Sequence, residues 1–154
     1  MKPDENGTLK SWSAVLSDAA DRQPELLDDI AARISDAGIP DSSASPVGKD
    51  RIVCRHARFA DCQLVIRAWA PGTHIVVAWQ LLCRPGWFKR KYTEAVAGDS
   101  YALSLPRGAG LRQEFTAWMD IIHGCVIASV KQIDNEIKTG HLIRRETTDA
   151  LDDW

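Results

Sequence analysis

The residues best suited to bind a metal are Cys54, His56 and Cys62, which lie close together in the chain. Cys54 and His56 would share one face of a strand, because side chains alternate across a strand. A zinc module, however, needs four ligands, and its ligands usually come in closely spaced pairs such as Cys-x-x-Cys. The sequence offers neither a dependable fourth ligand nor such a pair, so we expect no bound metal and no cofactor.

A cysteine nucleophile activated by a histidine is the second chemistry that these residue types allow. The candidate pairs combine Cys83 or Cys125 with His74 or His123. Such a site needs the base within hydrogen-bonding distance of the thiol, and donors that stabilise the oxyanion. No local motif supplies this arrangement, so an enzyme is the least favoured class of function. We expect all four cysteines to be reduced and mostly buried thiols.

A cluster of cations and aromatics, RPGWFKRKY from Arg84 to Tyr92, is the most distinctive surface motif. Its cations could contact a phosphate backbone or an anionic membrane, while its rings stack on bases or enter the membrane interface. The alternative is an ordinary strand with Phe88 and Tyr92 facing the core and the lysines facing water. The candidate binding residues of this motif are Arg84, Trp87, Lys89, Arg90 and Lys91.

Composition places the chain among ordinary globular proteins. Its 154 residues fit one domain, 1–154, and hydrophobic residues make up 45% of them. The net charge of −2 provides no overall attraction to nucleic acid. The N-terminal MKPDENGTLK lacks the apolar region of a secretory signal, and no apolar run is long enough to span a membrane. We therefore expect a cytoplasmic protein.

A β-meander between residues 62 and 92 is the element around which the rest must be arranged. Runs rich in Val, Ile and Trp alternate with two Pro-Gly turns, which is the pattern of antiparallel strands. With Pro71-Gly72 at the centre of the first turn, Ala68 pairs with Ile75. A Pro-Gly pair suits a type I or II turn, so we expect a slightly wider loop or a bulge. One face of the hairpin is then wholly apolar, and the mixed opposite face includes Trp69 and Val76.

The N-terminal part is expected to form a helical hairpin over residues 8–38. Thr8 can cap a first helix that ends near Arg22, and Pro24 suits the first turn of a second helix that stops at Gly38. A Ser/Pro/Gly connector, 41–50, would follow it. The next segment, 51–59, reads as an arginine-rich edge strand.

The remaining segments complete an α+β fold, with residues 51–138 forming a sheet and a long helix. Further strands are expected at 87–95 and 101–105, which gives a four- or five-stranded antiparallel meander. A long C-terminal helix, 111–138, would pack on the sheet. The polar tail, 139–154, is expected to be a frayed helix or a disordered end, although its acidic residues and terminal tryptophan could also form a docking peptide.

The long helix is apolar over most of its circumference, which indicates contacts on more than one side. The sheet can cover one side, and the N-terminal helices or a second copy of the chain must cover the other. We therefore expect a homodimer, with Trp118 and Ile122 near the contact.

The function that this pattern favours is a non-catalytic protein-interaction module, such as a chaperone, adaptor or inhibitor acting on a larger protein assembly. The binding surface would be the apolar helix or the mixed sheet face around Trp69 and Val76. The alternative is a peripheral nucleic-acid or anionic-membrane binder that uses the basic-aromatic turn from Arg84 to Tyr92.

Overall fold

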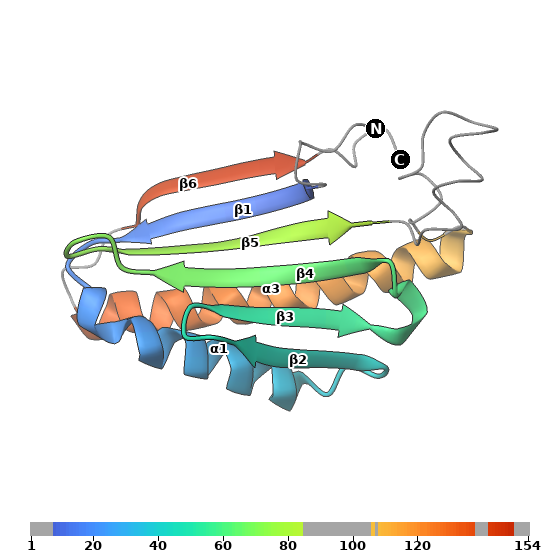
Figure 1. The fold of residues 1–154 in the computed structure, drawn as a ribbon, viewed down its shortest axis with the longest axis horizontal. Helices are drawn as coiled ribbons and strands as arrows, with labels where there is room; N and C mark the ends of the chain where they lie inside the picture. The colour runs from blue at the N-terminus through green and yellow to red at the C-terminus, as the bar shows by residue number, and fades with distance from the viewer. Residues whose placement is uncertain (1–7, 85–105, 107, 138–141, 150–154) are drawn as a thin grey trace.

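Figure 1 shows a computed structural model of the chain, in which residues 8–84, 106, 108–137 and 142–149 are described. Within these residues, six antiparallel strands form one sheet in the order β2-β3-β4-β5-β1-β6. The predicted α+β class with an antiparallel sheet is confirmed. The strands are β1 (Thr8–Leu16), β2 (Ser42–Val47), β3 (Arg51–His56), β4 (Cys62–Trp69), β5 (Ile75–Cys83) and β6 (Leu142–Asp149).

Two helices, α1 (Gln23–Ala37) and α3 (Ala109–Ile137), cover one face of this sheet (Figure 1). Both were predicted, and each lies within two residues of its expected bounds. Gly38 ends α1 in the left-handed conformation, with φ of 60°, as expected of a glycine stop signal. The buried core between sheet and helices includes Trp12, Leu16, Ile52, Leu64, Ile66, Ile75, Val77, Trp79 and Leu81 from the strands and Leu26, Ile30, Phe115, Trp118, Ile122 and Val126 from the helices.

The first predicted helix is wrong, because residues 8–16 form strand β1. Trp12, Ala14 and Leu16 are buried, while the residues between them are half-buried, which is the alternation of a strand. β1 lies between β5 and β6, so neighbours on both sides satisfy its backbone hydrogen bonds. The N-terminal hairpin of two helices is therefore replaced by β1, a short 3₁₀ turn η1 (Ala20–Arg22) and α1.

The expected connector, 41–50, contains strand β2, which forms the edge of the sheet beside β3. The strand predicted over 51–59 is confirmed only as far as His56, because the last three residues form the 3₁₀ turn η2 (Ala57–Phe59). Its assignment as an edge strand is wrong, since β2 pairs with one side of it and β4 with the other.

The β4–β5 hairpin is confirmed, but its register differs from the predicted one by two residues. Ala68 pairs with Val77 rather than with Ile75, because the loop takes up residues 70–74 and Gly72 has a φ of 71°. The turn is therefore wider than a two-residue loop, as expected. A shift of two residues leaves every side chain on its predicted face, so the apolar set remains buried.

The C-terminal tail is also different from its prediction. Residues 142–149 form β6, which pairs with β1, and so this segment is neither a frayed helix nor a disordered end. The strands predicted at 87–95 and 101–105 lie outside the described residues. In the described part of the chain, neither helix has the length and apolar character needed to cross a membrane.

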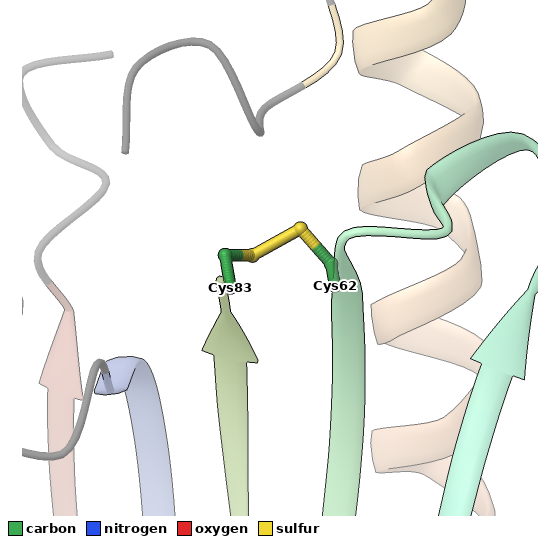
Figure 2. The surroundings of a disulfide bond; sticks show 2 residues. All are labelled: Cys62 and Cys83. Atoms are coloured by element: carbon green, nitrogen blue, oxygen red, sulfur yellow. A yellow bond between two sulfur atoms is a disulfide. The ribbon is translucent and has the colours of Figure 1, made fainter. Parts of the chain in front are cut away.

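A disulfide bond joins Cys62 of β4 to Cys83 of β5, at the end of the hairpin away from its turn (Figure 2). The two residues are register partners with Cα atoms 4.1 Å apart. The neighbouring N–H of Arg84 donates to the Asp61 carbonyl at 2.8 Å, which makes Cys62 and Cys83 a non-hydrogen-bonded pair, where facing side chains are closest. The expectation of four reduced thiols is therefore wrong; Cys54 and Cys125 are the free cysteines.

Candidate functional site

The face of the sheet opposite α1 and α3, here named the open face, is covered by neither of the two helices (Figure 1). The alternation of the strands directs every second side chain of β1, β3, β4 and β5 to it. The open face carries Ser11, Ser13, Val15, Arg51, Val53, Arg55, Gln63, Val65, Arg67, Trp69, Val76, Ala78, Gln80 and Leu82.

An apolar row crosses the open face beside the hairpin loop. Trp69 pairs with Val76, and Val76 pairs on its other side with Val15, so their side chains are neighbours on one face. Trp69 is 38% exposed, which is unusual for so large an apolar side chain. Trp69 and Val76 were both predicted on this mixed face, and both lie there.

Cationic side chains lie next to the apolar row. The guanidinium of Arg67 lies over the Trp69 ring, 5.4 Å from its centroid, a distance that allows a cation–π interaction. Arg67 also pairs in register with Arg51 of β3. Two like charges at directly opposite positions repel each other, and the Asp50 carboxylate offsets this repulsion by contacting Arg51 Nε and Arg67 Nη2, each at 3.5 Å.

The middle of the open face is aliphatic. Val53 pairs with Val65, and Val65 is only 9% exposed although it faces away from the helices. Arg55 is exposed beyond this pair and adds a third cation. Along β4, Arg67 lies between Val65 and Trp69 on this face, so apolar and cationic positions alternate across it. Arg51 and Arg55 were not predicted as binding residues, because 51–59 was expected to be an edge strand, and Arg67 of β4 was not singled out either.

Arg84, the first residue of the predicted basic-aromatic turn, is exposed at the disulfide end of the hairpin. With Arg55 and Asp61 it lines a shallow pocket of about 280 Å³. The remaining candidates of that turn, Trp87, Lys89, Arg90 and Lys91, lie outside the described residues.

Trp118 and Ile122, the residues expected near a dimer contact, are buried in the chain's own core. Trp118 is 1% exposed, and its indole N–H donates to the Ser42 hydroxyl at 3.0 Å. The sheet and α1 cover the side of α3 that carries Trp118 and Ile122, whereas Ile121 of the same helix is 42% exposed. A dimer would therefore have to use residues other than Trp118 and Ile122.

The candidate metal ligands have other roles. Cys62 is bonded to Cys83, and His56 Nδ1 accepts a hydrogen bond from the N–H of Arg58 at 3.2 Å. In the part of the chain that the structure describes, no group of three His, Cys, Asp or Glu side chains could hold a metal ion.

The residues of the candidate Cys/His pairs also have other partners or surroundings. Cys83 is in the disulfide, and burial raises the pKa of the Cys125 thiol, which disfavours the reactive thiolate. Each histidine ring has a different partner: His123 Nδ1 accepts from Trp79 Nε1 at 3.0 Å, and His74 Nδ1 accepts from the N–H of Asp18 at 3.4 Å.

The open face is therefore the surface whose residue types and exposure are best suited to binding. No protein-family model, no curated protein and no solved structure matches this chain.

Proposed function

We propose that the protein is a non-catalytic interaction module that binds a protein partner on the open face. The observation that carries this proposal is the row of Trp69, Val76 and Val15, continued by the Arg67 guanidinium over the Trp69 ring. Tryptophan and arginine are the residues that most often dominate the binding energy of protein interfaces. A chaperone, an adaptor or an inhibitor of a larger assembly would each use such a surface.

The chemistry of the open face specifies the partner further. Its valines and Trp69 favour apolar side chains of a partner, and Arg51, Arg55 and Arg67 favour carboxylates next to these apolar contacts. The Asp50 carboxylate already neutralises part of this charge. The partner we propose therefore presents aliphatic or aromatic side chains flanked by Asp or Glu.

The β2 edge is less suited to a partner than the face, because Pro46 interrupts it. The N–H of Ala57 donates to the Asp41 carbonyl at 2.8 Å, so Asp41 and Ala57 form a hydrogen-bonded pair. Such pairs alternate along an antiparallel ladder, so Pro46, opposite Ile52, is at a non-hydrogen-bonded position. Its nitrogen faces away from β3 and has no hydrogen to donate to an added strand.

The test is affinity purification of the intact protein from its native cells, followed by mass spectrometry. Trp69→Ser should weaken binding of the recovered partner at least about tenfold, the loss typical of a central aromatic contact. Ile121→Ser is the matched control, because Ile121 is 42% exposed but lies on α3, in the helical layer. Equal recovery by wild type and Trp69→Ser would refute the proposal.

A polyanion binder remains the second candidate, and the pocket shared by Arg55 and Arg84 favours it. Binding to single-stranded RNA or anionic vesicles would weaken steeply as salt rises, because each phosphate contact releases a counterion. Protein binding through the apolar row should instead persist at moderate salt. Strong, salt-sensitive binding that Lys89→Glu with Lys91→Glu abolishes, while Trp69→Ser leaves it intact, would favour the polyanion.

A further inference from the structure

A separate pocket of about 270 Å³ lies between the start of α1 and the turn that joins β2 to β3. Its apolar lining comes from three elements: Pro24, Leu27 and Ala31 of α1, Pro46 of β2 and Ile52 of β3. Ile52 is 1% exposed, so the pocket reaches down to the core. Concave sites with mainly apolar walls and a few polar groups are the usual binding sites of small molecules.

The walls of the pocket are held in place by Gln23, which also lines it. The Gln23 side-chain amide donates to the carbonyl of Lys49 at 3.0 Å and to that of Ala68 at 2.7 Å. These two bonds fix the start of α1 to the β2–β3 turn and to β4. A site with rigid walls loses less conformational entropy when a ligand binds.

Two side chains of opposite charge lie at the rim of the pocket. Asp28 comes from α1 and Lys49 from the β2–β3 turn, and both side chains are exposed. In the described residues, neither side chain has an ion pair, with the other or with a third group. Arg51 also lines the pocket, but its guanidinium contacts the Asp50 carboxylate. The rim therefore offers one carboxylate and one ammonium group to a ligand.

We propose that this pocket binds an apolar α-amino acid as a free zwitterion. The ligand's ammonium group would pair with Asp28, its carboxylate with Lys49, and its side chain would lie on the apolar lining. This site shares Arg51 with the open face, but the ligand contacts proposed here involve neither Arg51 nor a protein partner. Its exposed ion pairs are weak, so we expect an affinity in the millimolar range.

The test is a titration of the intact protein with L-phenylalanine, in which binding is measured by changes in the amide chemical shifts of NMR spectra. Saturable shifts should be concentrated at Leu27, Gly48 and Ile52, which line the pocket. N-acetyl-L-phenylalanine lacks the ammonium group and L-phenylalaninamide lacks the carboxylate, so each should bind about two- to fivefold more weakly. Shifts that do not saturate, or that lie elsewhere, would refute the site.

Variants assign each ligand group to its protein partner. Lys49→Gln should weaken binding of L-phenylalanine but not of L-phenylalaninamide, because the amide has no carboxylate to lose. Asp28→Asn should likewise weaken L-phenylalanine but not the N-acetyl compound. If both variants weaken all three ligands equally, the proposed pairing is wrong.

A filled-pocket variant and a control complete the experiment. Ala31→Met adds side-chain volume at the lining and should abolish the shifts, with an unchanged circular dichroism spectrum reporting an intact fold. Trp69→Ser lies on the open face and should bind L-phenylalanine as wild type does. Undiminished binding by Ala31→Met, or its loss in Trp69→Ser, would place the ligand outside this pocket.

Discussion

Arg51 and Arg67 lie directly opposite each other on neighbouring strands, and both contact one carboxylate, that of Asp50. Without Asp50, two guanidinium groups would face each other across the ladder. We expect Asp50→Asn to lower the free energy of unfolding by about 0.5–1 kcal/mol, measured by urea denaturation at low salt. Arg51→Gln in the Asp50→Asn background should recover most of this loss. An equal loss at high salt would contradict the electrostatic explanation, because salt screens exposed charges.

The disulfide predicts that the denatured protein has two titratable thiols, those of Cys54 and Cys125, in a DTNB assay. The bond closes a loop of sequence separation 21. Reduction should therefore lower the free energy of unfolding by about 3 kcal/mol, as urea denaturation with and without dithiothreitol can measure. Cys62→Ala with Cys83→Ala should abolish the response to dithiothreitol. Four thiols in the protein as isolated would contradict the bond.

This bond also bears on localisation. Disulfides persist mainly in oxidising compartments and are rare in the cytosol. The expectation of a cytoplasmic protein rested on the N-terminal residues and on the lack of a membrane-spanning apolar run, and neither of these observations shows which cysteines face each other across a sheet. The redox state in native cells, trapped by acid quenching and alkylation, therefore distinguishes a stable structural bond from a reduced pair.

The burial of Cys54 predicts that the stability of the protein depends on pH. Burial, and secondarily the charge of nearby Cys125, raises the pKa of its thiol from the ordinary 9.0 to about 12. The folded state favours the neutral thiol. The contribution of this thiol to the free energy of unfolding is therefore complete below pH 9, and it is lost between pH 9 and pH 12. We expect wild type to lose about 2 kcal/mol more stability than Cys54→Ala between pH 8 and 10.5, measured by urea denaturation. A parallel pH profile for the two proteins would contradict this.

Trp118 is expected to support the fold itself rather than an assembly. Trp118→Ala removes a fully buried ring and its hydrogen bond to Ser42, and it should lower the free energy of unfolding by about 3–5 kcal/mol. The homodimer remains a prediction, and light scattering at micromolar concentration tests it. If Trp118→Ala converted a dimer into a stably folded monomer, Trp118 would be a contact residue after all.

Pro46 is expected to prevent the β2 edge from pairing with another chain. Pro46→Thr would restore a donor that faces outward, and we expect self-association that increases with protein concentration in sedimentation velocity experiments. The matched control is Ser45→Thr, because Ser45 is at the hydrogen-bonded position opposite Val53 and its N–H already faces β3. Identical sedimentation of both variants would show that Pro46 does not protect the edge.

Local patterns were sufficient for α1, β3, β4, β5 and α3, because periodicity and stop signals lie within each segment. They were insufficient for β1, because Leu9, Trp12 and Leu16 fit a helical spacing, whereas the strand has an irregular register between Thr8 and Lys10 and regular alternation only from Trp12 onward. The disulfide was missed for a related reason. In the predicted register Cys62 would have faced Leu81, and the observed shift of two residues, set by the loop, brings it opposite Cys83.

The sequence pattern also predicted some features of the candidate site and missed others. Trp69 and Val76 were placed correctly because alternation alone determines the face of a strand. The opposition of Arg51 and Arg67 depends on the register between β3 and β4, which the sequence pattern does not specify. The burial of Trp118 depends on α1 and the sheet covering both sides of α3, which is a property of tertiary packing.

The position of β1 between β5 and β6 has a consequence for synthesis on the ribosome. β1 emerges first, yet one of its partners is completed only at Cys83 and the other begins at Leu142. Its apolar side chains, Leu9, Trp12 and Leu16, must therefore remain unpaired while the rest of the meander emerges and pairs with its nearest neighbours in the chain. The early meander has low contact order and can fold quickly, whereas insertion of β1 closes a long loop and should be the slow step. The nascent chain is consequently most prone to aggregation between the completion of α1 and that of β5.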